Sequence, residues 1–262
     1  MSTFRFEQHG AVGKLILLRD ADSEPGSDFP SSLRAAVRQA YASDIRVLHL
    51  ASASGNFAVA DDLGTIGDKG SKFLEAFAAD ILASVRLIEE LPIPTVASLA
   101  GMALGGGFEL LLAFDFLVVA ESAMLVLPEV SVGGLPMAGG VQRLADRVGK
   151  ALATRFVLLS EPIFGKVAVD LGIATHSVPD GELEQVSDEL VQHLATGPTL
   201  SYGKARTLIR TWATGGVSAA DIISTQLGAG ILDTKDGAEG MAIAVAAVRK
   251  HEPIPKIQFS GK

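Results

Sequence analysis

Hydrophobic and polar positions alternate along the first half of the chain with two different periods. Short, nearly continuous apolar runs are typical of buried strands, and we expect strands over 4–8, 12–18, 45–50, 95–100 and 116–120, with a short extended piece over 124–127. Segments with an apolar residue at every third or fourth position predict helices over 31–42, 72–89 and 106–113. Because strands and helices alternate, the predicted fold class is α/β, with a mainly parallel sheet and crossover helices.

The pattern changes near residue 138, after which helical spacing dominates. We expect one strand over 175–178 and helices over 138–147, 149–160, 165–171, 180–195, 198–213, 218–231 and 236–250. The chain is therefore predicted to divide into an α/β core over 1–195 and a helical C-terminal region over 196–262. The last helix carries Met241, Val245 and Val248 on one stripe, which either packs within the chain or docks on a neighbouring subunit.

Composition and charge narrow the range of partners. The chain has 262 residues, with 22 Lys and Arg against 30 Asp and Glu, and its net charge of −8 disfavours nucleic acid and anionic membranes. It has no cysteine, which excludes disulfides and thiolate nucleophiles. The charge-free run over 91–108 contains two prolines and four glycines, so a buried strand, turn and helix is favoured over a membrane span. Because the first ten residues show no signal or transit pattern, we expect a cytoplasmic protein.

The stretch "GMALGGGFELL", residues 101–111, is the first candidate site. Three consecutive glycines let a ligand approach the main chain, because no Cβ atom intervenes. The Gly106 N–H at the predicted helix start has no intrahelical partner and could stabilise a developing oxyanion. Glu109, in the same first turn, could face the same ligand. The alternative is that the glycines only allow tight packing of strand and helix, with Glu109 as a favourable charge near the helix N-terminus.

A second carboxylate lies in "LPEVSVGGLPMAGGVQRL", residues 127–144, where Glu129 follows a proline. If Glu129 and Glu109 lie close together, they can hold one water and divide the roles of general acid and general base. Other chemistries find no support. The glycine-rich stretches lack the endings of a phosphate-binding loop or a dinucleotide fingerprint, and no serine nucleophile motif is present. The five histidines are scattered, so no metal site is predicted.

Residues 92–144 resemble the central signature of the crotonase superfamily, the enoyl-CoA hydratases and isomerases. The resemblance includes the alanine-leucine-triple-glycine turn, the glutamate after it, Asp115, the proline-glutamate pair and the Gly-Gly-x-x-Arg-Leu helix start. It implies a spiral α/β core of repeated ββα units with a C-terminal helical trimerisation region. It further implies a homotrimer or a dimer of trimers.

Carried over by position, the resemblance implies a reversible addition of water to a 2-enoyl-CoA thioester through an enolate, as in fatty acid metabolism. Glu109 would activate the water and Glu129 would protonate the α-carbon. The main-chain N–H groups of Gly106 and Asp61 would form the oxyanion hole. CoA would enter as part of the substrate, with no separate cofactor. The residues expected to bind the substrate are Ala58, Val59, Ala60, Leu104, Gly105, Pro128, Gly133 and Leu135.

Two departures from the family pattern leave alternatives open. Ala60 stands where the family has glycine, and Asp61 brings a carboxylate to the hole; it either turns away, is protonated, or caps a helix together with Asp62. The acidic "LRDADSEPGSDFPSSL" replaces an Asn-Arg-Pro and Asn-Ala stretch that shapes the CoA site. The alternatives are an isomerase or a hydrolase of a thioester or C–C bond, on a substrate with or without CoA, and a weakly catalytic paralogue acting by assembly.

Overall fold

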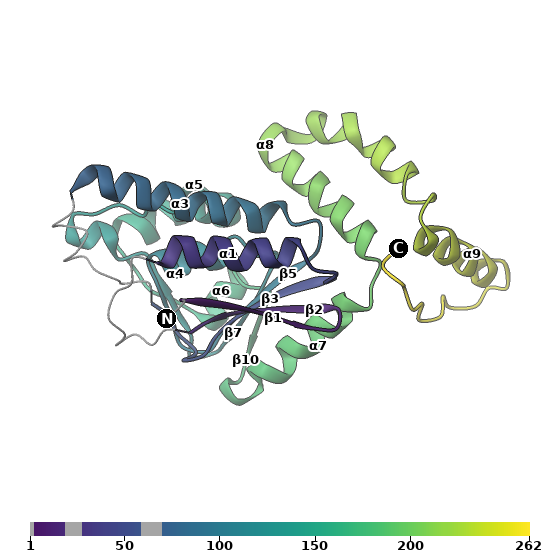
Figure 1. The fold of residues 1–262 in the computed structure, drawn as a ribbon, viewed down its shortest axis with the longest axis horizontal. Coiled ribbons are helices and arrows are strands. Elements are labelled where there is room, and N and C mark those ends of the chain that lie inside the picture. The colour runs from purple at the N-terminus through teal and green to yellow at the C-terminus, as the bar shows by residue number, and fades with distance from the viewer. Residues whose placement is uncertain (1–2, 19–27, 59–69) are drawn as a thin grey trace.

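The computed structural model describes residues 3–18, 28–58 and 70–262, which form two sheets surrounded by helices (Figure 1). The larger sheet has six strands in the order β1-β2-β3-β5-β7-β10. Its strands are β1 Phe4–His9, β2 Val12–Leu17, β3 Val47–Ser52, β5 Thr95–Leu99, β7 Phe116–Ala120 and β10 His176–Val178. Only β1 and β2 pair antiparallel; every other neighbouring pair in this sheet is parallel, as predicted.

A second sheet of four short strands was missed by the sequence analysis. Its strands, in the order β4-β6-β8-β9, are β4 Phe57–Ala58, β6 Met102–Leu104, β8 Met124–Val126 and β9 Ile163–Phe164. Only β8 was expected, as an extended piece. Strands of two or three residues are too short to show a period, and the residues of β6 were assigned to the glycine turn.

The two sheets are built by a repeat. Three consecutive units each place one strand in the large sheet and the next strand in the small sheet, and then form a helix. The units are β3-β4-α3, β5-β6-α4 and β7-β8-α5, and their helices are α3 Ser71–Glu90, α4 Gly106–Leu111 and α5 Gly140–Leu158. The prediction of an α/β fold with repeated ββα units is therefore confirmed. Gly149, at φ +78°, interrupts α5 where the sequence predicted a break between two helices.

Both faces of the large sheet are buried, which explains the near-continuous apolar runs of its strands. Leu48 and Leu50 pack on the side of α1 (Phe29–Tyr41), α3 and α4, in the main core. Val47 belongs to a second cluster with α7 (Leu183–Ala195). His49 shares the face of Val47, since side chains alternate along a strand. It is 5% exposed and hydrogen-bonds to Ser98 Oγ at 2.9 Å. Burial lowers its pKa to about 4.

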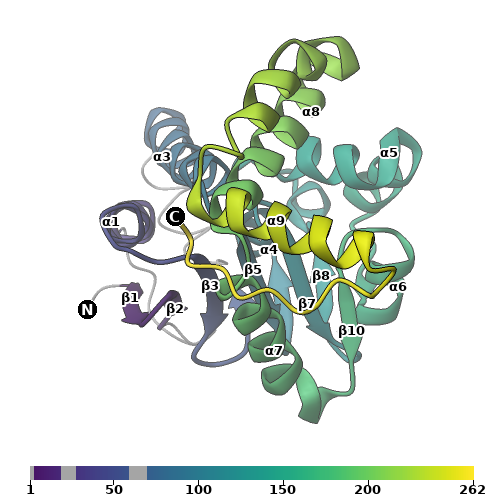
Figure 2. The same ribbon diagram turned by 90° about the vertical axis from the view of Figure 1, so that its right-hand side faces the viewer.

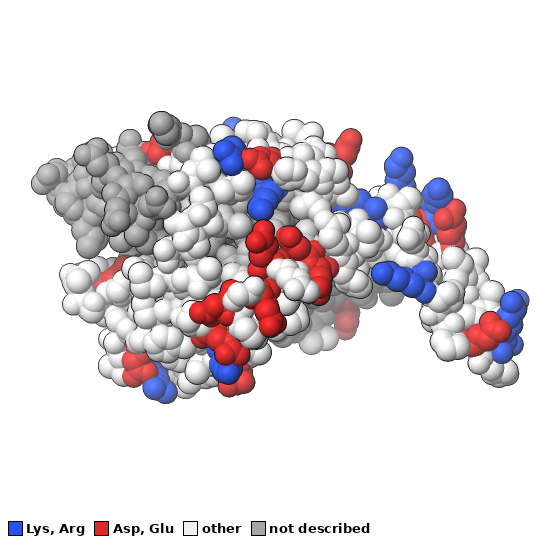
Figure 3. Space-filling model, turned by 90° about the horizontal axis from the view of Figure 1, so that it is seen from below, with Lys and Arg blue, Asp and Glu red and all other residues white. Residues whose placement is uncertain are grey.

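The outer surface around α7 is acidic. Figure 3 looks onto the molecule from this side and shows acidic side chains gathered in its middle. Residues 180–195 contain no Lys or Arg but five exposed acidic residues: Asp180, Glu182, Glu184, Asp188 and Glu189. Such a surface carries no electrostatic attraction for a phosphate backbone.

The C-terminal helices α8 (Thr199–Ala229) and α9 (Lys235–Arg249) form an arm that extends from the core (Figures 1 and 2). Gly216, at φ +72°, kinks α8 where a break between two helices was expected. The arm exposes large apolar side chains, among them Ile209, Trp212, Val217, Ile222, Leu232, Met241, Val245 and Val248. None of the helices in the described part of the chain has the length and apolar character needed to cross a bilayer. The domain boundary at 195 stays a prediction.

The last residues of the chain return to the start of the arm. Arg46 donates hydrogen bonds to Gly197 O at 2.5 Å, Thr199 Oγ1 at 2.8 Å and Phe259 O at 3.1 Å. Asp236, at the start of α9, accepts hydrogen bonds from Ser260 N–H and Oγ and from Gly261 N–H. Both ends of the arm are therefore attached beside Arg46, and Figure 1 shows the C-terminus close to the start of α8.

Candidate active site

Glu109 lies in the first turn of α4 and is buried, with 2% of its surface exposed. Its Oε1 accepts a hydrogen bond from Gly140 N–H at 2.7 Å, and the Ala138 main chain also stabilises the carboxylate. The pKa of Glu109 is raised to about 6, mainly by burial and also by the negative charge of Glu129, while the two main-chain groups and Arg143 act in the opposite direction. Glu109 is thus ionised at neutral pH yet close to its own pKa, which suits a general base.

Glu129 begins the short 3₁₀ helix η1 (Glu129–Val132) and is half-buried. A Cβ atom at Gly105 would lie 2.5 Å from Glu129 Oε1, so the carboxylate lies directly against the turn that precedes α4. Glu129 Oε2 is buried and has no hydrogen-bond partner among the described residues. Burial raises the pKa of Glu129. A buried carboxyl oxygen without a partner is costly in a folded protein, and it is typical of a group whose partner is a ligand.

The three glycines of the turn have different surroundings. Gly105 has φ +49° and faces Glu129, whereas a Cβ atom at Gly107 would lie 1.7 Å from Phe57 O. Tight packing of strand against helix, one of the two interpretations of the sequence, therefore holds for Gly107. This packing brings the end of β4 beside the start of α4, and Ala58 pairs with Leu104 in the small sheet. The segment proposed as the second half of the oxyanion hole begins at that point.

The other predicted site residues are placed as follows. Val59, Ala60 and Asp61 lie outside the described residues, so the second donor of the oxyanion hole stays a prediction. Gly106 starts α4, and Leu104 and Pro128 are half-buried beside Gly105 and Glu129 in the sequence. Gly133 ends η1 in the left-handed region at φ +79°, and Leu135 beyond it is 63% exposed.

Glu109 and Glu129, 20 positions apart in the sequence, are thus brought together around the turn before α4. Each carboxyl has a pKa above its ordinary value, and the first N–H groups of α4 come directly before Glu109 in the sequence. Two carboxyls with raised pKa values around unpaired main-chain donors can take a proton from water, return one to carbon and stabilise a developing negative charge.

The sequence analysis missed the residues that hold Glu109. Gly140 has no side chain, and a Cβ atom there would lie 2.5 Å from Glu109 Cγ. On the next turn of α5, Arg143 forms two hydrogen bonds with Glu89 of α3, at 2.6 and 2.7 Å. The pair of glycines before a helix was visible in the sequence. Its contact with a glutamate 31 positions earlier was not.

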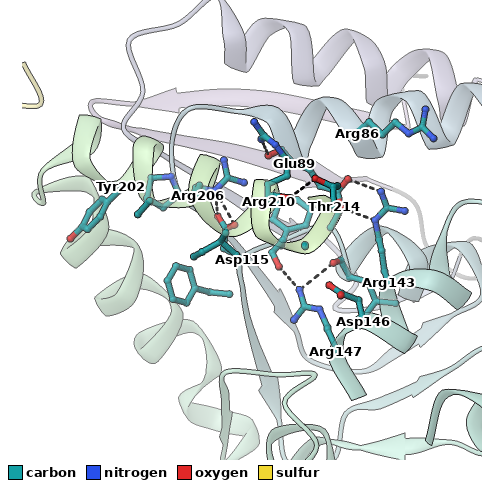
Figure 4. A pocket seen from close by; sticks show the side chains of 18 of the residues that line it. Arg86, Glu89, Asp115, Arg143, Asp146, Arg147, Tyr202, Arg206, Arg210 and Thr214 are labelled. Carbon is teal, nitrogen blue, oxygen red and sulfur yellow. Dashed lines mark hydrogen bonds and ion pairs between the residues drawn. The ribbon is translucent and has the colours of Figure 1, made fainter. Parts of the chain in front are cut away.

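A cavity of about 790 Å³ lies between α8 and the core, separate from the two glutamates (Figure 4). Five arginines from α3, α5 and α8 line it: Arg86, Arg143, Arg147, Arg206 and Arg210. Arg206 pairs with Asp115, whose carboxylate also accepts two hydrogen bonds from Thr95. Arg147 donates to the carbonyls of Leu112 and Phe114 at the end of α4. These contacts fix the C-terminal end of α4, the helix that carries Glu109.

Comparisons with known proteins identify the family of the chain. A sequence model of the family described as enoyl-CoA hydratase/isomerase matches residues 29–242. The chain is 30% identical over 218 residues to an enoyl-CoA isomerase/hydratase of Mycosarcoma maydis, and the matched region covers 83% of this chain and 77% of the relative. It is 30% identical over 216 residues to a probable enoyl-CoA hydratase of Mycobacterium bovis, with 80% of each chain covered.

The fold has close likenesses among solved structures. The crystal structure of an enoyl-CoA hydratase from Bacillus anthracis superposes with a TM-score of 0.85 at 24% identity, over 99% of this chain and 100% of that one. At this identity the structural likeness shows the fold alone, and the sequence matches show the family. The chain belongs to the enoyl-CoA hydratase/isomerase family, within the crotonase superfamily.

Proposed function

We propose that this protein is an enoyl-CoA hydratase, which adds water reversibly across the double bond of a 2-enoyl-CoA thioester. The observation that carries the proposal is the pairing of Glu109 and Glu129 in one buried site, where Glu129 Oε2 has no partner among the described residues. A pair of carboxyls can hold a water, whereas a single carboxyl is enough to move a proton in an isomerisation. The names of the relatives also support an acyl-CoA substrate.

In the proposed reaction the ionised Glu109 accepts a proton from the water as its oxygen bonds to the β-carbon. The π electrons move toward the thioester, and its carbonyl oxygen becomes an enolate. The enolate then collapses, and its α-carbon takes a proton from the protonated Glu129. The raised pKa of Glu129 favours the protonated form that this step needs. Proton exchange between the two carboxyls through solvent restores the starting state.

The Gly106 N–H is the proposed donor to the enolate oxygen. It starts α4, so it has no intrahelical partner, and Gly105, which lacks a side chain, lets the Glu129 carboxylate lie against the same turn. Removing one donor from such a hole costs roughly 3 to 4 kcal/mol of transition-state stabilisation. The Asp61 N–H is proposed as the second donor, and the segment after Ala58 starts beside α4 as that role requires.

The remaining parts of the proposal concern the assembly and the carrier. CoA enters as part of the substrate, without a separate cofactor or metal. The apolar residues exposed along α8 and α9 support a homotrimer or a dimer of trimers built by the arm. We further propose that the protein acts in the cytoplasm.

The test is direct hydration of a short 2-enoyl-CoA, followed by loss of the conjugated thioester absorbance and by the mass of the product. We expect turnover in the parent and a loss of at least roughly a hundredfold in Glu109→Gln and in Glu129→Gln. Glu121→Gln is the matched control, because Glu121 is partly exposed and pairs with Lys166 on the surface. Full activity in both site variants would refute the proposal.

Other products would identify the alternatives. A shifted double bond would indicate an isomerase, and free CoA or a shortened acyl chain would indicate a hydrolase. The relative from Mycosarcoma maydis is named for both isomerase and hydratase, so both products should be sought. If no acyl thioester is turned over, assembly with a partner becomes the better hypothesis; turnover lost in a single glutamine variant excludes it.

A further inference from the structure

We propose that Arg143 and Glu89 are positioning residues for Glu109, acting through the turn formed by Gly139 and Gly140. The proposal rests on the proposed function, since it assigns these residues to the base of that reaction. The argument follows the chain of contacts from α3 to Glu109.

The first contact is the ion pair between the two helices. Arg143 Nε donates to Glu89 Oε1 at 2.7 Å, and Arg143 Nη2 donates to Glu89 Oε2 at 2.6 Å (Figure 4). The side chains are only 14% and 30% exposed. Two parallel hydrogen bonds between a guanidinium and a carboxylate fix both the distance and the orientation of the groups. The pair therefore holds the guanidinium in one place relative to α3.

The second contact joins the guanidinium to the turn. Arg143 Nη1 donates to Gly139 O at 3.2 Å. Gly139 has φ +97°, and a Cβ atom there would lie 1.9 Å from Arg143 Nη1. The guanidinium thus occupies the space of the missing side chain. Glycine at this position has a positive φ that other residues rarely adopt, and it admits the arginine against the main chain.

The third contact joins the turn to the base. Gly140 N–H donates to Glu109 Oε1 at 2.7 Å, and the glycine lies against the Glu109 side chain. If the turn shifts, this N–H shifts with it. The peptide bond between Gly139 and Gly140 thus links the two side chains. Its carbonyl accepts from the Arg143 guanidinium, and its N–H donates to the Glu109 carboxylate.

Glu89 is itself held from the arm. Arg210 Nη1 of α8 donates to Glu89 O at 2.7 Å, and Arg206 of the same helix donates to Leu91 O at the end of α3. Figure 4 shows both arginines reaching from α8 toward the core. Two arginines of α8 therefore cap the C-terminal end of α3. They hold the main chain of Glu89 in place, so that its side chain is positioned to bind Arg143.

Two effects of Arg143 on Glu109 can be separated. Among the described residues, the charged groups that act on Glu109 are Glu129 of η1 and Arg143 of α5. The positive charge of Arg143 lowers the pKa of Glu109, so Arg143→Gln should raise it. Arg143→Lys keeps the charge but lacks the planar fork that binds Glu89 and Gly139 together. It should still misplace the Gly140 N–H, whose hydrogen bond also lowers the pKa of Glu109, so the pKa should rise less than in Arg143→Gln.

The experiment compares Arg143→Gln, Arg143→Lys and Glu89→Gln with Arg155→Gln. The control removes an exposed arginine from the same helix, where it pairs with Glu161. The first readout is the titration of Glu109 by carboxyl ¹³C NMR, assigned by the loss of its signal in Glu109→Gln. The second is the pH profile of kcat/KM, together with kcat and KM for hydration of a short 2-enoyl-CoA.

We expect the pKa of Glu109 to rise most in Arg143→Gln, which loses both the positive charge and the contact that places Gly140, and to rise less in Arg143→Lys and Glu89→Gln, which keep the charge. In the three network variants we expect kcat to fall roughly tenfold to a hundredfold with less than about a threefold change in KM, as for a base displaced by a fraction of an ångström to an ångström. A parent-like titration in Arg143→Gln, or parent-like kcat in Arg143→Lys and Glu89→Gln, overturns the proposal. The NMR titration needs no substrate. If the parent protein does not hydrate the enoyl-CoA, the proposed function is refuted. The titration still separates the charge effect of Arg143 on Glu109 from its positioning effect.

Discussion

Replacing Glu109 by glutamine should stabilise the folded protein at neutral and alkaline pH while it removes the proposed base. Glu109 is 2% exposed, and burial is the main cause of its raised pKa. The ionised form is therefore destabilised by the fold. Glutamine has nearly the same size and keeps an Oε1 that accepts the hydrogen bond from Gly140 N–H.

The magnitude follows from the pKa. The value in the folded protein is about 6, against an ordinary value of 4.5, a difference of about 1.5 units. At 1.36 kcal/mol per unit, the ionised Glu109 costs about 2 kcal/mol of folding stability. Since the folded-state pKa lies above the unfolded one, the unfolded chain binds fewer protons between pH 4.5 and 6. The parent therefore loses this stability as the pH rises through that window, and the glutamine variant does not.

The assay is urea unfolding of parent and Glu109→Gln at pH 8 and at pH 4, at one fixed protomer concentration. We expect the variant to be more stable by about 2 kcal/mol at pH 8 and equal to the parent at pH 4, where Glu109 is protonated in both states. A variant that is no more stable than the parent at pH 8, or that differs from it equally at both pH values, would show that the fold does not oppose the ionised carboxylate.

Three further changes test other parts of the structure. The parent should lose stability between pH 7 and pH 4, and His49→Gln should reduce that loss by about 3 kcal/mol. The reason is that the pKa of His49, lowered from 6.5 to about 4, stabilises the folded state above pH 6.5, and this stability is lost as the pH falls toward 4. Urea unfolding curves at the two pH values measure the difference. Gly107→Ala should cost about 1 to 3 kcal/mol and reduce turnover, since its Cβ would lie 1.7 Å from Phe57 O, while Gly181→Ala, with open space around it, is the control. Asp115→Asn should cost about 1 to 3 kcal/mol in urea unfolding, because Arg206, 11% exposed, then lacks its carboxylate partner.

The fold followed from the sequence wherever an element was long enough to show its period. The strand β7 was predicted with the bounds that it has, and α3 within one residue at each end. Breaks near Gly149 and Gly216 were also predicted, between the helices expected over 138–147 and 149–160 and between those expected over 198–213 and 218–231. The small sheet was missed, since strands such as β4, with two residues, show no alternation.

The candidate site was predicted in part. Glu109 and Glu129 stood out because each follows a distinctive turn, but their proximity depends on how β6 and β8 pair in the small sheet. The support around Glu109 could not be predicted in the same way. Arg143 binds Glu89 across 54 positions, and Gly140 binds Glu109 across 31. Local patterns encode helices and turns, whereas such contacts arise only when the helices pack.

The attachment of both ends of the arm beside Arg46 has a consequence for dissecting the protein. A cut in the short connection between α8 and α9 would leave the second fragment bound through Ser260 and Gly261 to its own Asp236, and through Phe259 to Arg46 of the first fragment. The chain could therefore be produced as two complementing pieces divided between Ala229 and Lys235. Exchanging the smaller piece between relatives would then separate what α9 and the last residues contribute from what α8 and the core contribute, without changing a single residue of the core.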